Sequence, residues 1–362
     1  MPPVVRHAIT MRFLFAFFLL FPFASSPGAS EPAPILLSAA QEKFGADLAA
    51  RVSVLEKGSA GAVAGSKGWV FLTAELRFLS VGQFWGSQAA KVSRSSKAEW
   101  ADPLAAITDF QKQLKAKGVD LLLVPVPPKA AIYPEDIVPD FPAGGGDAAP
   151  YLARFYTELE SAGVDVLDLT ATFKKNRGSE RGEVYCRTDS HWSGLGCVLA
   201  AQAIAERIKS KLPTGSLGKT FSADWKAAVI KGDLADLLPP GAKKPGEETI
   251  AVRVVSEKCS DAALEADAKS PLLLMGDSHT LVFHDFFAQR AGLLDQLAAE
   301  TGIVPDLIGT RGSGATTVRL TLYRKSLKDP EYLAKKKLII WCFTAREFTE
   351  ASQGWQKAPV AK

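Results

Sequence analysis

The chain has 362 residues, of which 47% are hydrophobic and 23% are charged, with 43 Lys and Arg against 39 Asp and Glu. This balance excludes a disordered or collagen-like chain and leaves room for two domains or one large α/β domain. The formal net charge is only +4 and the sequence has no long run of Lys or Arg, which argues against a nucleic-acid-binding protein.

The N-terminus has the three parts of a secretory signal peptide. Arg6 and Arg12 precede the apolar run 13–23, and small residues follow it. The run is about half of the roughly 20 residues that span a bilayer. We therefore expect residues 1–30 to be a signal peptide and the protein to be periplasmic. An uncleaved inner-membrane anchor is the alternative.

The first predicted elements follow a weakly patterned start. Residues 31–64 are rich in Ala and are expected to form an N-terminal extension. The short apolar run 68–72 predicts a buried strand, near which the folded domain begins. Asp102 and Pro103 then predict the N-cap and the first turn of a helix that ends before Gly118.

Apolar runs alternate with helical patterns from there to the C-terminus. The predicted strands cover residues 121–126, 164–169, 272–275, 306–308 and 337–343, and the predicted helices cover 151–162, a stretch after 191, a stretch from about 279, and 332–336. Uninterrupted apolar strands are typical of parallel sheets covered on both faces, so this order predicts a three-layer α/β/α fold. We expect one domain over residues 65–350, with an insertion or small lobe at 213–268 and a C-terminal tail at 351–362.

Histidines are rare in this chain, which narrows the choice of a catalytic base. His7 lies in the signal region, so His191, His279 and His284 remain. His191 follows Asp189 by two residues, and a carboxylate at that spacing can accept a hydrogen bond from the imidazole and orient it. The alternative is that Asp189 only caps the following helix and that His191 is a surface residue.

A second candidate element is the Gly-Asp-Ser sequence that ends in Ser278, directly after the predicted strand 272–275. A serine there can place its hydroxyl at the carboxyl edge of the sheet, where backbone N–H groups at a helix start stabilise an oxyanion. The alternative is a serine that only caps the helix. Asp189, His191 and Ser278 together would supply the acid, base and nucleophile of an acyl-transfer site.

Two glycines and an arginine are candidates for oxyanion or substrate binding. Gly312 and Gly314 follow a predicted strand and could donate backbone N–H groups to an oxyanion or a sugar, or only form a turn. Arg346 follows the last predicted strand. We expect it either to bind the acceptor or to form a surface ion pair with Glu347 or Glu350.

Two aromatic residues and a lysine complete the candidate site. Trp192 and Tyr133 are expected to form a sugar-stacking wall or to pack in the core. Lys129 is expected to orient a carboxylate or to cap the sheet edge. His279 and His284 lie five residues apart, off the i, i+4 spacing of a helical metal pair, so we expect neither a metal nor a cofactor.

The four cysteines, Cys186, Cys197, Cys259 and Cys342, are an even number in a chain expected to reach an oxidising compartment. They allow three patterns of two disulfides. Cys197 and Cys342 lie in apolar stretches that suit buried free thiols equally well. Both interpretations stay open.

These motifs resemble those of a known family. The Gly-Asp-Ser block is similar to the nucleophile block of SGNH hydrolases. The Asp-x-His spacing and the chain order Asp, His, Ser differ from SGNH hydrolases and match the alginate O-acetyltransferase family of the AlgJ and AlgX type, whose SGNH-like domain is permuted. The resemblance extends over residues 68–72, 125–129 with Tyr133, 189–193, 276–278 and 341–346.

The resemblance implies an SGNH hydrolase-like fold in which Ser278 becomes acetylated, His191 is its base and Asp189 orients that base. It implies transfer of acetyl groups to hydroxyls of an exported polysaccharide, with a membrane-bound O-acyltransferase as donor. The chain ends 16 residues after Arg346, so we expect no carbohydrate-binding domain of the AlgX type and a layout nearer AlgJ. A carbohydrate acetylesterase with the same triad and a non-catalytic polysaccharide-binding subunit are the alternatives.

Overall fold

The computed structural model describes residues 35–142, 146–212, 220–258 and 262–362. Residues Ile35–Lys362 form one compact unit. The predicted signal peptide lies outside the described residues, as does Cys259. In the described part of the chain, no helix is both long and apolar enough to cross a membrane.

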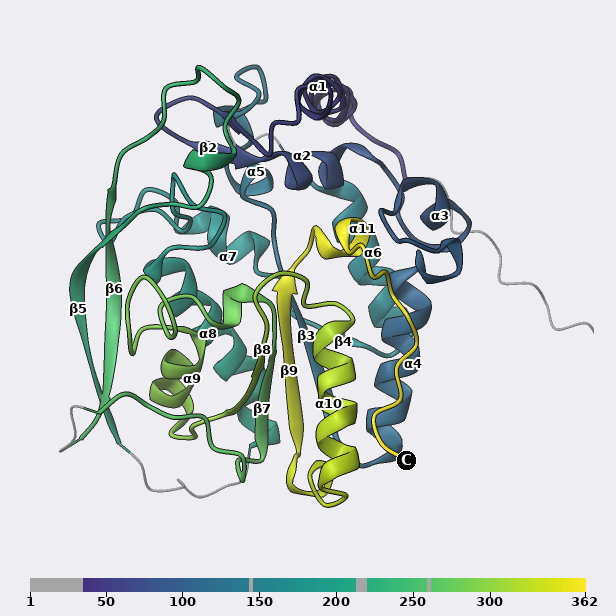
Figure 1. The fold of residues 1–362 in the computed structure, drawn as a ribbon, viewed down its shortest axis with the longest axis vertical. Coiled ribbons are helices and arrows are strands. Elements are labelled where there is room, and N and C mark those ends of the chain that lie inside the picture. Colours follow the sequence, from purple (N-terminus) through teal and green to yellow (C-terminus); the bar gives the residue numbers. More distant parts are fainter. Residues whose placement is uncertain (1–34, 143–145, 213–219, 259–261) are drawn as a thin grey trace, which may run out of the picture. The chain divides into compact units, whose positions relative to one another are not determined.

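A five-stranded parallel sheet lies at the centre of this unit, with helices on both of its faces (Figure 1). Its strand order is β4-β3-β9-β7-β8. The strands are β3 (Asp120–Val126), β4 (Asp165–Val166), β7 (Leu272–Gly276), β8 (Asp306–Gly309) and β9 (Leu338–Thr344). The last of these strands in the sequence therefore lies in the middle of the sheet, between β3 and β7.

Successive strand residues point to opposite faces and enter two separate hydrophobic cores. In β3, Leu122 and Val124 belong to one core, whereas Leu121 and Leu123 belong to the other. The first core includes α8 (Gly194–Ile208) and α9 (Leu293–Thr301), and the second includes α4 (Pro103–Ala116), α6 (Pro150–Ser161) and α10 (Thr317–Lys328). Since the sheet is covered on both faces, the predicted three-layer α/β/α fold is confirmed.

The predicted start of α4 is confirmed at its N-cap. The Asp102 carboxylate accepts a hydrogen bond from Leu104 N at 3.0 Å, and Pro103 occupies the first turn. Shorter helices and 3₁₀ turns connect the longer elements: η1 (Gly86–Gln88), α3 (Ala89–Val92), η2 (Ala98–Trp100), α5 (Lys129–Ile132), η3 (Pro134–Asp136), α7 (Thr170–Lys175), η4 (Lys209–Lys211), η5 (Ala235–Leu237) and α11 (Glu347–Glu350).

Two predicted helices are wrong. The helix expected from His279 is only a 3₁₀ turn, η6 (Ser278–Thr280), and α9 does not begin until Leu293. The chain between them contains residues with left-handed backbone conformation, which an α-helix cannot include. The helix expected at 332–336 is the single turn η7 (Leu333–Lys335).

The segment 31–64, in which no helix was predicted, contains the long helix α1 (Ala39–Lys57). Ser38 and Gln41 cap it reciprocally, with the Ser38 hydroxyl accepting from Gln41 N at 3.3 Å and the Gln41 side chain accepting from Ser38 N at 2.9 Å. One face of α1 packs against α2 (Thr73–Ser80). Its low amphipathicity explains why the sequence pattern did not reveal it.

Two antiparallel strand pairs lie outside the central sheet. β1 (Ala62–Ala64) pairs with β2 (Val70–Leu72), and β5 (Phe221–Ile230) pairs with β6 (Glu248–Glu257). The long β5–β6 hairpin falls within 213–268, where the sequence indicated an insertion or small lobe. Its strand β6 contacts α8 and α9, its strand β5 contacts α9, and the hairpin runs along the left side of Figure 1.

Candidate active site

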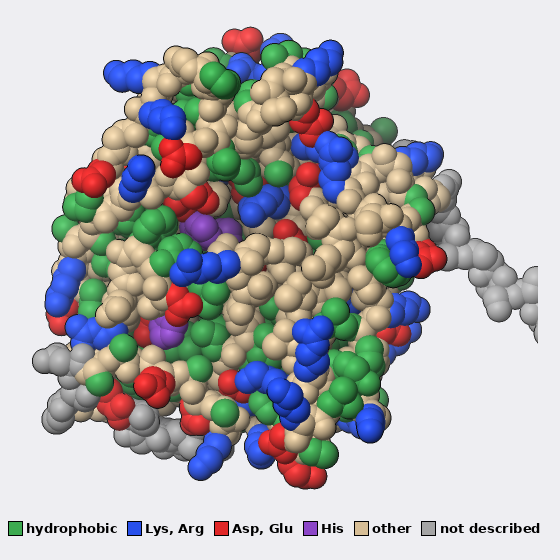
Figure 2. Space-filling view, in the orientation of Figure 1, with side chains coloured by type: hydrophobic (Ala, Val, Ile, Leu, Met, Phe, Trp, Pro, Cys, Tyr) green, Lys and Arg blue, Asp and Glu red, His purple; other side chains and the backbone are tan. Residues whose placement is uncertain are grey.

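The fold brings together three side chains that are far apart in the sequence. Ser278 begins the turn after β7, and His191 lies shortly before α8, 87 residues earlier. His191 Nε2 is 2.7 Å from Ser278 Oγ, and His191 Nδ1 is 2.6 Å from Asp189 Oδ1. On the face drawn in Figure 2, histidine side chains show at two separate places, and the upper of these borders a hollow with basic, acidic and hydrophobic side chains around it.

Asp189 is fully buried, and both oxygens of its carboxylate accept hydrogen bonds. Oδ1 accepts from His191 N at 2.9 Å as well as from the ring, and Oδ2 accepts from Asp233 N at 2.8 Å. Burial opposes ionisation of Asp189, but the hydrogen bond from His191 outweighs it and lowers the pKa to about 2. An ionised Asp189 keeps the proton on His191 Nδ1, so Nε2 is free to accept the proton of Ser278.

The turn that carries Ser278 is tied to the neighbouring strand. Asp277 Oδ1 accepts from His279 N at 2.9 Å, and Oδ2 accepts from Thr344 N, at the end of β9, at 2.7 Å. Gly276 lies so close to β9 that a Cβ there would be 1.6 Å from Cys342 O. A glycine at the end of β7 thus lets the turn that carries Ser278 approach β9.

His279, like His191, follows an aspartate by two residues and contacts that aspartate through Nδ1. Its Nδ1 is 3.2 Å from Asp277 Oδ1, and burial lowers the pKa of its imidazole. Its ring packs 4.8 Å from the ring of His191, centroid to centroid. Because Ser278 Oγ is hydrogen-bonded to His191, the geometry favours His191 over His279 as the base.

The two candidate glycines, Gly312 and Gly314, differ in how they lie relative to the turn that carries Ser278. A Cβ on Gly314 would lie 2.7 Å from Asp277 N, so this residue packs directly against the turn. Gly312 has a φ of +98° and open space around its Cα. Of the two, Gly314 is therefore the one that lies next to Ser278.

Arg346 makes a different ion pair from the one expected. Its Nη1 is 3.8 Å from Glu75 Oε1 and donates to Thr344 Oγ1 at 3.1 Å. Glu347 instead accepts from the Ser313 hydroxyl, and Glu350 pairs with Arg77. The expected surface pair with Glu347 or Glu350 is wrong, because α11 turns these two carboxylates toward other partners.

The two aromatic candidates are buried. Trp192 is 0% exposed and packs edge-on against His279, with ring centroids 5.1 Å apart. It has no exposed ring face, so a sugar-stacking role for Trp192 is wrong. Tyr133 is 2% exposed, accepts from Val184 N at 3.1 Å and donates to Glu183 at 3.0 Å.

Sequence reasoning missed the residues that hold the turn at Asp189. The Asp233 carboxylate accepts from Ser190 N at 2.7 Å and from Ser190 Oγ at 2.6 Å. Glu248 accepts from Arg187 N at 3.0 Å and from Thr188 N at 3.1 Å. Both acids come from the segment 213–268. No local pattern marks them, since their partners lie 43 to 61 residues earlier.

One group of ligand-type atoms in the described residues lies close enough together to hold a metal ion. Asp189, His191 and Asp233 each offer an atom, and these atoms lie within 4.8 Å of one another. The same carboxylates already accept the hydrogen bonds of the triad and of Ser190. A metal bound there would therefore have to displace those hydrogen bonds.

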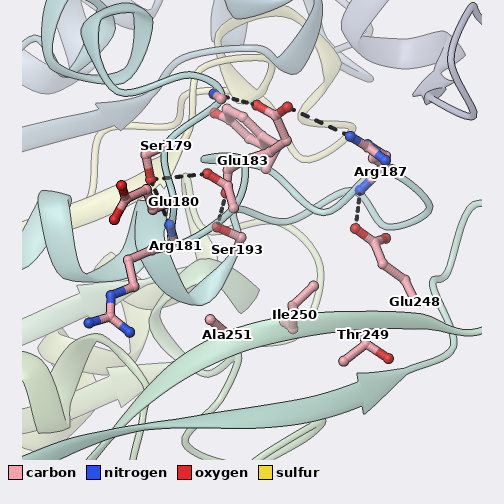
Figure 3. A pocket seen from close by; sticks show the side chains of 13 residues that line it. Ser179, Glu180, Arg181, Glu183, Arg187, Ser193, Glu248, Thr249, Ile250 and Ala251 are labelled. Atoms are coloured by element: carbon pink, nitrogen blue, oxygen red, sulfur yellow. Dashed lines mark hydrogen bonds and ion pairs between the residues drawn. The ribbon is translucent and has the colours of Figure 1, made fainter.

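Two cavities lie beside the segment that leads to His191. The larger, of about 550 Å³, lies between residues 178–187 and β6, and in Figure 3 Ile250 and Ala251 lie opposite Glu183 and Ser193. The second, of about 430 Å³, shares Gly178, Glu183 and Arg187 with it. The lining residues of the second cavity are Lys67, Trp69, Tyr133, Asp136, Lys174, Arg177, Gly178, Glu183 and Arg187.

Comparison with known families identifies the domain. Residues 62–345 match the model of the SGNH hydrolase-like domain of the acetyltransferase AlgX. The chain belongs to this family. The AlgX-family match includes Asp189, His191 and Ser278 and extends over all five strands of the central sheet.

Individual relatives agree with the family. The chain is 29% identical over 188 residues to the probable alginate O-acetylase AlgJ of Pseudomonas aeruginosa, covering 52% of this chain and 43% of that protein. It is 28% identical over 236 residues to the protein of the same name from Pseudomonas putida, covering 63% of this chain and 57% of that protein. The chain thus spans about half the length of the curated relatives it matches.

Solved structures share the fold. The O-acetyltransferase domain of Pseudomonas putida AlgJ superposes with a TM-score of 0.60 at 24% identity, covering 80% of this chain and 92% of that chain. Pseudomonas aeruginosa AlgX gives a TM-score of 0.57 at 16% identity, covering 79% of this chain and 62% of that chain. At these identities the likeness shows the SGNH hydrolase-like fold.

Proposed function

We propose that this chain is a periplasmic O-acetyltransferase that moves acetyl groups to hydroxyls of an exported polysaccharide through a covalent acetyl-Ser278. The observation that carries the proposal is the hydrogen-bonded series Asp189–His191–Ser278, with distances of 2.6 Å and 2.7 Å. Membership of the AlgX family supports acetyl as the transferred group.

In this mechanism His191 is the base in both half-reactions. It takes the proton of Ser278 as Oγ attacks the acetyl carbonyl, and it returns that proton to the leaving alcohol. A sugar hydroxyl then attacks acetyl-Ser278 with His191 again as base, and Ser278 leaves as the free alcohol. Ionised Asp189 stabilises the positive charge on His191 at each step.

The oxyanion of the two tetrahedral intermediates needs donors near Ser278. In the proposed mechanism, the backbone N–H groups of Ser278 and Gly314 are the candidate donors, since Gly314 packs against the nucleophile turn. Gly312 is the weaker candidate because its Cα lies in open space.

The smaller of the two cavities supports an acidic polysaccharide as the acceptor. Its wall carries four basic side chains, Lys67, Lys174, Arg177 and Arg187, against the acids Asp136 and Glu183. Three of them also form ion pairs: Lys67 with Asp136, Arg177 with Glu135 and Arg187 with Glu183. The names of the relatives point to alginate. As part of the same proposal, residues 1–30 direct export, residues 65–350 form the transferase domain, and a membrane-bound O-acyltransferase supplies the acetyl group.

The decisive experiment is to incubate the protein with an activated acetyl ester and look for a covalent acetyl group by mass spectrometry. We expect stoichiometric acetylation of Ser278 in the unmodified chain and none in Ser278→Ala. Ser326→Ala, which removes a buried hydroxyl on α10, is the matched control and should label normally. Equal labelling of Ser278→Ala and the unmodified chain would exclude this nucleophile.

The acetylesterase alternative uses the same triad with water as acceptor. Products formed from one donor, with and without alginate oligosaccharides, separate the two functions: an esterase releases acetate in both cases, whereas a transferase acetylates the sugar. A non-catalytic binding subunit would form no acetyl-serine. The short His191–Ser278 distance favours the enzymes over that subunit.

A further inference from the structure

The loop between η6 and α9, residues 281–292, has an unusual and well-fixed backbone. Phe283, Phe287 and Arg290 have φ values of 64°, 66° and 61°, in the left-handed region that non-glycine residues rarely adopt. Phe283 N donates to Phe286 O at 2.9 Å, and Ala291 N donates to Phe283 O at 2.9 Å. Strained backbone that is held in this way is concentrated at functional sites.

This backbone places Phe286 against the proposed catalytic base. The Phe286 ring lies 5.7 Å from the His191 ring, at an interplanar angle of 72°, in an edge-to-face contact. The ring is half-buried, so part of it is exposed to solvent while it contacts the buried His191. Phe286 is thus a partly exposed aromatic side chain that contacts the triad.

A second segment secures the same ring. The guanidinium group of Arg311, in the loop after β8, lies 4.7 Å from the centroid of the Phe286 ring. Arg311 is exposed, so its charge remains hydrated on its outer side. Phe286 and Arg311 come from loops at either end of the α9–β8 unit and together form a wall beside the imidazole.

We propose that Phe286, clamped by Arg311, is a specificity-determining residue that excludes water from acetyl-Ser278 and so favours transfer over hydrolysis. This inference rests on the proposed function. In transfer, a sugar O–H attacks the acetyl carbonyl, His191 takes its proton, and Ser278 leaves with that proton, giving the sugar acetate. In hydrolysis, water takes the same path and gives acetate.

Transfer and hydrolysis use the same base and the same leaving group, so they differ only in whether a sugar hydroxyl or water reaches the acetyl carbonyl. A sugar hydroxyl is delivered from a bound ring, whereas water must diffuse to a position beside His191 Nε2. An apolar ring against the imidazole offers that water no hydrogen-bond partner on one side. Removing the ring opens this space to water without changing Asp189, His191 or Ser278.

The test measures the ratio of the two products that form from acetyl-Ser278, acetate and acetylated sugar. The variants are Phe286→Ala and Arg311→Gln. The matched control is Phe221→Ala, which removes the ring of a half-buried phenylalanine in β5. p-Nitrophenyl acetate is the donor and alginate oligosaccharides are the acceptor. The burst of p-nitrophenol gives the acetylation rate, and acetate and acetylated sugar are quantified in the same reaction.

We expect Phe286→Ala to raise the ratio of acetate to acetylated sugar by about tenfold and to leave the acetylation rate within about threefold of the unmodified chain. Arg311→Gln should raise the ratio of acetate to acetylated sugar less, by about threefold, because the Phe286 ring remains but loses its contact with the guanidinium group. Phe221→Ala should leave both quantities unchanged.

An unchanged ratio in both variants would overturn the proposal. A parallel fall in acetylation, transfer and hydrolysis would also overturn it, because Phe286 would then only position His191. If Phe286→Ala does not fold, Phe286→Leu and the exposed Arg311→Gln decide the question. Absence of acetyl-Ser278 in the unmodified chain contradicts the proposed function, whereas normal acetylation with an unchanged ratio contradicts only the role of Phe286.

Discussion

Lys129 is completely buried next to Asp189, and its ammonium group binds main-chain oxygens. Nζ donates to Val70 O at 2.9 Å and to Asp189 O at 2.5 Å. The sequence left open whether Lys129 orients a carboxylate or caps the sheet edge; its ammonium group instead binds the backbone of Asp189, whose carboxylate contacts His191. Burial lowers the pKa of Lys129, while the nearby charge of Glu75 favours its protonated form.

Replacement of Lys129 by Met should destabilise the protein by about 3 kcal/mol. The change leaves two buried carbonyl groups without their donor and removes one of the two cations near the buried Glu75, so that only Arg346 remains. Urea denaturation followed by circular dichroism measures the free energy of unfolding. Lys91→Met, at an exposed position, should stay within about 0.5 kcal/mol of the unmodified chain. Equal stability of the two variants would show that the buried ammonium group is not needed.

The loop that joins β8 to α10 supports the turn that joins β7 to α9. Gly314 packs against Asp277, and its carbonyl accepts from Trp341 Nε1 of β9 at 3.1 Å. A Cβ at Gly314 would meet both Asp277 N at 2.7 Å and Asp277 Cβ at 2.9 Å. The two connections therefore fit together only with glycine at this position.

The variant Gly314→Ala should lower the rate of acetyl transfer by about 100-fold, because displacement of the nucleophile turn moves Ser278 away from His191. Steady-state kinetics with an acetyl ester measures the effect, and thermal unfolding shows whether the fold persists. Gly45→Ala in α1, where a Cβ meets no atom within 4 Å, is the control and should retain normal activity. Normal kinetics for Gly314→Ala would mean that this contact does not position Ser278.

The whole unit is held together without a disulfide among its described cysteines. Cys186, Cys197 and Cys342 are free and buried, and all three lie in the first of the two hydrophobic cores, the one that includes α8 and α9. Burial raises the pKa of all three thiols, which keeps them protonated and unreactive. Of the alternatives open from the sequence, the structure favours buried free thiols for these three.

Thiol titration of the intact protein should therefore detect at most one of the four cysteines, Cys259, which lies outside the described residues. DTNB should react with the three buried thiols only after unfolding in guanidinium chloride. Dithiothreitol should leave the melting temperature unchanged, because no bond among these three cysteines is available to reduce. Rapid native labelling of two or more thiols, or a lower melting temperature with reductant, would contradict this arrangement.

Much of the fold was readable from local patterns. The apolar runs 121–126 and 337–343 are strands buried on both faces, and their alternate residues divide between two cores as a sheet covered by helices requires. The Asp102–Pro103 start of α4 was readable for the same reason, since a side-chain cap acts within one helical turn. The Asp-x-His spacing at Asp189 and His191 also depends on neighbouring residues alone.

Other features depended on contacts between distant segments. The turn at Ser278 has a helix-like sequence, yet Thr344 binds Asp277 and the chain continues as the loop that carries Phe286. Asp233 and Glu248 hold the turn at Asp189 from more than 40 residues away.

Residue types and short spacings therefore determined the strands of the central sheet, the fold class and the three chemical groups of the candidate site. Tertiary structure alone decided which histidine contacts Ser278, His191 or His279, because Ser278 and His191 lie 87 residues apart in the sequence and only the folded chain brings them within 2.7 Å. Hydrogen bonds between neighbouring residues can be inferred from spacing. Those between segments far apart in the sequence exist only after the sheet has brought the segments together.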